Sequence, residues 1–166
     1  MKISLVCMPF HDLHRPSIAL SLLKAKLIEE AHDVDIIYLN HVYSMVLGID
    51  DYMEVNINKY LLGEWIFSSV AFPDFSPNYK EYYDLCEFDE SKRAKVAKMK
   101  KEADIFTRKS AINILKSSPK IVGVTSLFTQ HCASLGLLRY IKECSPETIT
   151  VIGGGNCEGD MGRITF

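Results

Sequence analysis

Two short β-branched segments, one helix length apart, constrain the fold of this chain most strongly. The first covers residues 120–129 (KIVGVTSLFT) and the second covers residues 150–156 (TVIGGGN). Each segment ends in small or hydroxyl residues at the point where a strand should stop. In an open parallel sheet, ligands bind at the carboxyl ends of the strands. Glycines there let a ligand approach the backbone closely. The pattern therefore predicts a cofactor pocket rather than a set of catalytic side chains.

Length and composition indicate one domain that spans residues 1–166. With 48% hydrophobic residues the chain can bury one substantial core. The formal net charge of −2 gives no reason to expect a nucleic-acid partner or a membrane-surface partner. No apolar run approaches the roughly 18 residues that span a bilayer. The N-terminus has no long apolar region and no cleavage site, so it reads as a first strand.

The cysteine pattern indicates a reducing compartment. The chain has five cysteines, an odd number, and no two of them form a CxxC pair. Neither a disulfide framework nor a zinc site follows from this spacing. We therefore expect a cytoplasmic protein in which the cysteines act as small buried hydrophobes. They are Cys7, Cys86, Cys132, Cys144 and Cys157.

A strand–helix–strand unit is predicted at the N-terminus. Residues 2–8 are apolar almost throughout, as in a strand that is covered on both faces. Pro16 and Ser17 are helix start signals, and the apolar residues that follow recur at helical spacing over 17–31. Residues 34–39 form the next strand. The unit spans fewer than 40 residues, which implies a right-handed parallel crossover.

A second unit of the same kind is predicted at 121–152. It consists of a strand over 121–126, a helix over 130–144 with Thr129 as its N-cap, and a strand over 148–152. Between the two units, residues 41–118 contain no convincing strand and read as a helical insertion, with one long helix over 89–116.

Together these units predict an α/β protein with a doubly wound, flavodoxin-like parallel sheet of about four strands in the order 2-1-3-4. Such sheets usually have five strands, so we expect the chain to be the N-terminal fragment of a longer protein.

Two segments at the expected carboxyl edge are candidate binding sites. The glycine cluster 153–155 with Asn156 lies beside Thr125 and Ser126, and we favour a ligand site there over a plain turn. The loop 8–16 carries Arg15 and two histidines before a helix N-terminus, a place that suits an anionic group. Within it, Asp12 and His14 form a D-x-H pair that could orient an imidazole toward a metal. For the histidines we favour a solvated polar loop.

Other features favour ordinary structural roles. The cationic run over 92–101 is typical of the exposed face of a helix. Trp65 and its apolar neighbours read as core. The chain has no Ser/His/Asp order, HExxH, phosphate loop or GxGxxG, and no carboxylate pair stands out as acid and base. The sequence thus shows no catalytic apparatus of its own.

Six segments together carry a family resemblance. They are residues 8–10, 15–20, 61–65, 71–74, 122–126 and 153–159, and the last of them, with Asn156-Cys157-Glu158-Gly159, is the most specific. In these segments the chain resembles the N-terminal cobalamin-binding region of B12-dependent radical SAM proteins. It is most similar to the C-methyltransferases that mature ribosomally made peptide natural products.

The resemblance implies that cobalamin lies at the carboxyl edge and that its nucleotide tail passes between strands and helices. Thr125, Ser126 and Leu127 match a small-x-Leu pattern beside the tail, and Gly153 and Gly154 match paired glycines. An apolar platform for the corrin ring is expected from Met8, Phe10, Leu127 and Phe128. The full set of expected cofactor-binding residues is Met8, Pro9, Phe10, Arg15, Ser17, Thr125, Ser126, Leu127, Gln130, Gly153, Gly154, Gly155 and Asn156.

The resemblance also implies an activity that needs more than this chain. Such enzymes move a methyl group from S-adenosylmethionine to cobalamin and then to a carbon radical on a peptide. Their 4Fe-4S cluster requires a CxxxCxxC motif, which this sequence lacks. The expected partners are therefore a downstream radical SAM domain and a peptide substrate.

The chain departs from the B12 motif D-x-H-x-x-G, whose histidine binds cobalt from below. Residues 12–17 read DLHRPS, so that serine replaces the glycine and a proline falls inside the motif. Radical SAM relatives commonly lack this ligand, and we do not expect His14 to bind cobalt.

Two alternatives remain open from the sequence. One is a degenerate module that has lost its cofactor and binds a peptide or protein through residues 41–118. The other is an FMN electron carrier, which we disfavour because the loop after the first strand lacks the glycines and hydroxyl residues that hold phosphate.

Overall fold

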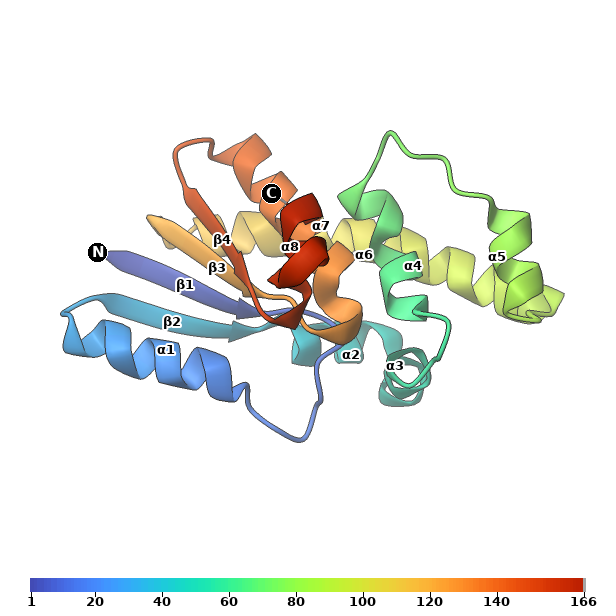
Figure 1. Cartoon of the computed structure of the whole chain (residues 1–166), viewed down its shortest axis with the longest axis horizontal. Coiled ribbons are helices and arrows are strands. Elements are labelled where there is room, and N and C mark those ends of the chain that lie inside the picture. The colour runs from blue at the N-terminus through green and yellow to red at the C-terminus, as the bar shows by residue number, and fades with distance from the viewer. Residues whose placement is uncertain (166) are drawn as a thin grey trace.

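Four short apolar segments form one parallel sheet in this computed structural model, which describes residues 1–165 (Figure 1). The strands are β1 (Lys2–Cys7), β2 (Asp33–Tyr38), β3 (Ile121–Thr125) and β4 (Ile149–Gly153). Their order is β2-β1-β3-β4, and every neighbouring pair is parallel. The predicted α/β class and strand order are confirmed. The register pairs Thr125 with Gly153, which brings the two predicted strand ends together.

The first crossover is the helix α1 (Ile18–Glu29), which packs against β1 and β2. Ser17 is its N-cap, and its hydroxyl accepts a hydrogen bond from the backbone N–H of Leu20 at 3.3 Å. Five buried residues make a small apolar cluster under this helix. They are Ile3, Leu5, Cys7, Leu20 and Val34.

The predicted insertion consists of five helices. They are α2 (Leu39–Leu47), α3 (Ile49–Asn56), α4 (Leu62–Ala71), α5 (Tyr79–Leu85) and α6 (Glu90–Leu115). Figure 1 shows the strands pointing toward this group, with α4 and α5 beyond the carboxyl ends of the sheet. Together with the later helix α7 (His131–Cys144), the insertion forms a large core on the face of the sheet opposite α1. None of the helices over residues 1–165 is long and apolar enough to cross a membrane.

Within the cationic run on α6, the side chains of Lys98 and Lys101 are exposed, and those of Lys92, Arg93 and Lys95 are partly exposed. Lys92 pairs with Glu54, and Lys95 pairs with Asp51 of α3. Lys100 is the exception, because its side chain points inward and is buried. The interpretation of the whole run as a solvated face was therefore wrong at that position.

The start of α7 differs from the prediction. Thr129 is not the N-cap, because the chain first makes a short 3-10 turn over Phe128–Gln130 and Gln130 occupies the cap position. The cap comes instead from another helix. The carboxylate of Glu64 on α4 accepts hydrogen bonds from the backbone N–H groups of His131 at 2.8 Å and Cys132 at 2.6 Å. A negative charge at a helix N-terminus is stabilising, so this contact ties the insertion to the second crossover. After β4 the chain turns and continues into α8 (Gly159–Thr165).

Candidate functional site

An apolar groove of about 340 Å³ lies on the α1 face of the sheet. Within residues 1–165, α1 covers β1 and β2 but no helix covers β3 and β4 on this face. Leu23 of α1 is 51% exposed, and Val151 of β4 is 48% exposed. The residues that line the groove are Ile3, Leu5, Ala19, Leu20, Leu23, Leu27, Ile121, Gly123, Val124, Thr125, Leu127, Val151, Gly153 and Gly154. We refer to it as the α1–β4 groove.

Two glycines form the carboxyl end of the α1–β4 groove. A Cβ atom added to Gly153 would have no atom within 4 Å apart from its chain neighbours, so the groove is open there. Gly154 has a φ of +126°, and a Cβ atom on it would lie 2.5 Å from the carbonyl oxygen of Ser126. Only glycine allows this conformation and this close approach of two backbones. Gly154 therefore shapes the edge, and Gly153 leaves room beside it. Gly155 follows at the start of the next turn.

Polar side chains join the loops after β3 and β4. The Ser126 hydroxyl lies 2.8 Å from Nδ1 of His131. Asn156 donates from Nδ2 to the Ser126 hydroxyl at 3.2 Å and to the Phe128 carbonyl at 3.0 Å. Nε2 of His131 lies 3.2 Å from the Thr165 hydroxyl. Because these groups bond to one another, they fix the shape of the edge.

Gln130 connects the loops after β1 and β3. Its Nε2 donates to the Met8 carbonyl at 2.5 Å, and its Oε1 accepts from the Leu127 N–H at 3.2 Å and the Thr125 hydroxyl at 3.3 Å. This side chain is buried, so its bonds act in a low-dielectric setting where a satisfied network rigidifies the structure. Thr125, Ser126, Leu127 and Gln130 are thus brought together as predicted from the sequence.

The thiol nearest to this network is inert. Cys7 ends β1 and is buried, and this burial raises its pKa to about 12. The thiol therefore stays protonated at neutral pH and cannot act as a nucleophile.

The loop after β1 does not supply the platform expected from it. Met8, Pro9 and Phe10 are buried. The Phe10 ring packs against Tyr52 and Tyr43, with ring centroids 5.0 and 5.8 Å apart. The expectation that the side chains of Met8 and Phe10 would face a corrin ring was wrong, because the insertion helices cover them. Two other members of the expected platform remain, since Leu127 lines the α1–β4 groove and Phe128 is 86% exposed.

In the polar part of that loop, His14 and Arg15 point to solvent as expected. The solvated interpretation was wrong for His11, which is half-buried and whose Nε2 is buried without a hydrogen-bond partner among residues 1–165. Nδ1 of His14 lies 3.3 Å from the Asp12 carboxylate, and the Arg15 guanidinium lies 3.8 Å from it. The His14 backbone N–H also donates to this carboxylate, which lowers the pKa of Asp12. Within residues 1–165 no group of three His, Cys, Asp or Glu side chains could hold a metal ion. The Ser17 hydroxyl is used as the N-cap of α1. Neither Arg15 nor Ser17 lines the α1–β4 groove.

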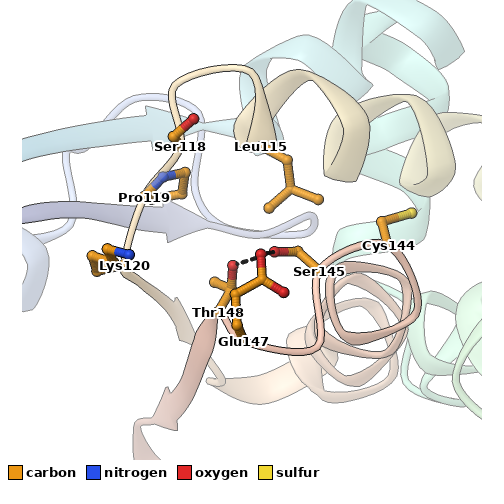
Figure 2. Close-up of a pocket in the computed structure, with 8 residues that line it drawn as sticks. All are labelled: Leu115, Ser118, Pro119, Lys120, Cys144, Ser145, Glu147 and Thr148. Carbon is orange, nitrogen blue, oxygen red and sulfur yellow. Dashed lines mark hydrogen bonds between the residues drawn. The ribbon is translucent and has the colours of Figure 1, made fainter.

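A second cavity, of about 300 Å³, lies at the amino edge of the sheet, between the α6–β3 and α7–β4 connections (Figure 2). Its polar groups are satisfied locally. The Ser145 hydroxyl donates to the Glu147 carboxylate at 2.6 Å and lies 2.8 Å from the Thr148 hydroxyl. The bond from Ser145 lowers the pKa of Glu147. Because ligands of open parallel sheets bind at the carboxyl edge, the α1–β4 groove is the stronger candidate.

Sequence reasoning missed Glu64 and His131 as parts of the edge. Glu64 caps a helix that begins 67 positions later in the chain, and no local sequence pattern predicts such a cap. His131 had a usable signal, since it directly follows the predicted site residue Gln130 where a helix should begin.

Comparison with known proteins gives no match. No family model fits the chain, and neither a curated protein nor a solved structure matches it. The assignment to cobalamin-binding proteins therefore stays a prediction that rests on the sequence and on the groove.

Proposed function

We propose that this chain binds cobalamin at the α1–β4 groove and forms the cobalamin-binding part of a radical SAM C-methyltransferase that acts on a ribosomally made peptide. One observation carries the proposal. An apolar groove of about 340 Å³ runs along the α1 face of a flavodoxin-like sheet and reaches the carboxyl ends of β3 and β4 at Gly153 and Gly154, beside Thr125 and Leu127.

The groove has the chemistry that the nucleotide tail of cobalamin needs. Dimethylbenzimidazole is a flat, largely apolar ring, and Leu20, Leu23 and Val151 give the groove apolar walls. The bare backbone of Gly153 leaves the entrance open. Ligand sites of this kind are mostly apolar, as this groove is. Thr125 lines it, while the Thr125 hydroxyl donates to Oε1 of Gln130.

The residues of the chain bind and orient, and bound cobalamin would supply a cobalt atom able to carry a methyl group. Leu127 and the exposed Phe128 offer apolar surface to a corrin ring at the edge. The bonds among Ser126, His131 and Asn156 hold the loops after β3 and β4 in place, so they would fix the edge that receives the ring.

The remaining parts of the reaction belong to the longer enzyme in this proposal. A downstream radical SAM domain would bind the 4Fe-4S cluster, S-adenosylmethionine and the peptide substrate. All five cysteines are free, which suits the reducing cytoplasm.

Cobalamin retention tests the proposal. The purified chain is incubated with hydroxocobalamin or with dicyanocobinamide, which lacks the nucleotide tail, and is then desalted. We expect cobalt-corrin absorbance to remain with the protein after hydroxocobalamin and to be at least about tenfold weaker after cobinamide. Tenfold corresponds to about 1.4 kcal/mol of tail binding. Loss of both corrinoids would contradict the proposal, and equal retention of both would contradict the role of the groove. Peptide binding without corrinoid binding would instead favour the degenerate interaction module.

A further inference from the structure

Lys100 is a buried cation without a carboxylate partner. It lies on α6 and is 8% exposed. Its Nζ donates to the Trp65 carbonyl at 2.5 Å and to the Ser68 hydroxyl at 2.9 Å, both on α4. Nζ also lies 4.9 Å from the centroid of the Trp65 ring and 5.8 Å from that of Tyr79. No acidic side chain among residues 1–165 forms an ion pair with it.

This arrangement leaves a positive charge uncompensated. Lysines are almost never fully buried unless they are paired, and a buried charge is costly unless it is both paired and hydrogen-bonded. Two neutral acceptors and two aromatic faces offset only part of that cost. In agreement with this, burial lowers the pKa of Lys100 to about 8.

Lys100 lines a cavity of about 590 Å³ between α4, α5 and α6. The other residues that line it are Ser69, Tyr79, Tyr83, Ala97, Lys101 and Asp104. Lys101 is exposed and adds a second positive charge. Asp104 is the one acid among these residues, and its carboxylate already accepts from the Tyr140 hydroxyl and pairs with Arg108 at 3.2 Å. The cavity thus combines two lysines with two tyrosine rings.

We propose that this cavity binds an aromatic carboxylate, whose negative charge pairs with Lys100 and Lys101 while its ring lies against Tyr79 and Tyr83. The ligand would supply the negative charge that no side chain among residues 1–165 supplies to Lys100. The cavity is separate from the α1–β4 groove, and the inference does not depend on the proposed cobalamin binding.

Trp65 provides a direct readout, because it is the only tryptophan of the chain and lies beside the Lys100 ammonium. The full chain is titrated with benzoate, with its neutral analogue benzamide, and with inorganic phosphate, and Trp65 fluorescence is followed. We expect a saturable change with benzoate and at least about tenfold weaker binding of benzamide and phosphate. Calorimetric titration gives the same affinities independently of fluorescence.

Three variants assign the site. Lys100→Met removes the buried charge but keeps the length of the side chain, a change that buried charged sites often tolerate, and it should abolish benzoate binding. Lys101→Met should weaken it several-fold. Lys109→Met, at an exposed position of the same helix, serves as the control and should leave it unchanged.

Several results would overturn the proposal. They are the absence of benzoate binding to the unaltered chain, undiminished binding to a folded Lys100→Met variant, and equal affinities for benzoate and benzamide. Equal affinities for benzoate and phosphate would reject the aromatic carboxylate in favour of a general anion site.

Discussion

The two faces of the sheet differ in how completely they are covered. One face is packed under α4, α6 and α7, and its core includes Tyr43, Tyr52 and Phe67, all fully buried. The other face has only α1, a small cluster of buried residues and an open apolar groove beside it. One face therefore holds most of the core, and the other holds a smaller cluster and an open apolar groove.

Aromatic packing contributes much of the stability of the face that is covered by α4, α6 and α7. Phe10, Tyr43 and Phe67 make edge-to-face contacts with centroid distances of 5.2 to 6.1 Å. Such pairs contribute about 0.5–1.5 kcal/mol each beyond the burial of their area. Among residues 1–165 the groove face has no comparable aromatic cluster, so its half-exposed side chains, such as Leu23 and Val151, can change with little loss of stability.

The largest expected effect compares one truncation on each face. Phe67→Ala should lower the free energy of unfolding by about 3–5 kcal/mol, because it leaves a cavity in a rigid core. Leu23→Ala, at a half-exposed groove position, should lower it by less than about 1 kcal/mol. Urea denaturation measures the free energy of unfolding of both variants. Equal decreases would contradict the conclusion that the face under α4, α6 and α7 stabilises the fold more than the groove face does.

The next effect concerns the cap that joins α4 to α7. Glu64→Gln should cost about 1–2 kcal/mol, because the carboxylate accepts from two N–H groups at a helix N-terminus. Glu29→Gln serves as the control, since Glu29 is exposed and paired only with Lys26 on its own helix, and it should change stability by less than about 0.5 kcal/mol. A similar decrease in the free energy of unfolding of both variants would mean that the Glu64 cap contributes no more stability than an exposed ion pair.

Lys100 makes the free energy of unfolding depend on pH. Its pKa is about 8 in the folded chain against the ordinary 10.5, so above pH 8 the folded state gives up a proton that the unfolded state keeps. The contribution of Lys100 to the free energy of unfolding should therefore rise with pH from 8 toward 10. Buried thiols oppose it, because burial raises the pKa of Cys7 and Cys132 in the folded chain, so the unfolded state loses their protons first and their contribution falls over the same range.

Lys100→Met checks this account. Between denaturation curves at pH 7.5 and at pH 9.5, the change in the free energy of unfolding should be more positive in the unaltered chain than in the variant, because the buried thiols contribute equally to both. Identical pH profiles for the two proteins would contradict the assignment to Lys100.

The smallest effect lies on the groove face. Ser17→Ala removes the α1 cap and should cost about 1 kcal/mol, with faster amide exchange in the first turn of α1. Ser21→Ala removes a hydroxyl that only bonds back to the Ser17 carbonyl of the same helix and should cost less. If exchange in α1 stays unchanged in Ser17→Ala, the cap does not hold the groove wall.

The parts of the fold that follow local patterns could be predicted from the sequence. The four strands, their order, α1 and the long α6 follow from apolar periodicity and from the rule for parallel crossovers. The meeting of Thr125 with Gly153 and Gly154 followed from that topology, because strand ends at one edge must converge.

What the sequence could not give depends on contacts between distant segments. Phe10 directly follows a strand, a position that suits a ligand-facing side chain as well as a core side chain. Only the placement of the insertion helices decides that Phe10 is part of the core. Thr129 has the right chemistry for an N-cap, but Glu64 from α4 performs that role after an extra 3-10 turn. Lys100 sits in a cationic run, and only the packing of α6 on α4 shows that it is buried.

The central claim is that the α1–β4 groove holds the tail of cobalamin, and filling the groove tests it most directly. Gly153→Val places a side chain where a Cβ has no atom within 4 Å, so the fold should tolerate it. Thr150→Val, on the same strand and the opposite face, also places a valine on β4 but replaces a hydroxyl by a methyl group without adding volume, and it serves as the control for a substitution outside the groove. Hydroxocobalamin affinity, measured by absorbance titration, should fall at least about tenfold in Gly153→Val, or by about 1.4 kcal/mol, and stay within about twofold in Thr150→Val. Undiminished binding by a folded Gly153→Val variant would contradict the account.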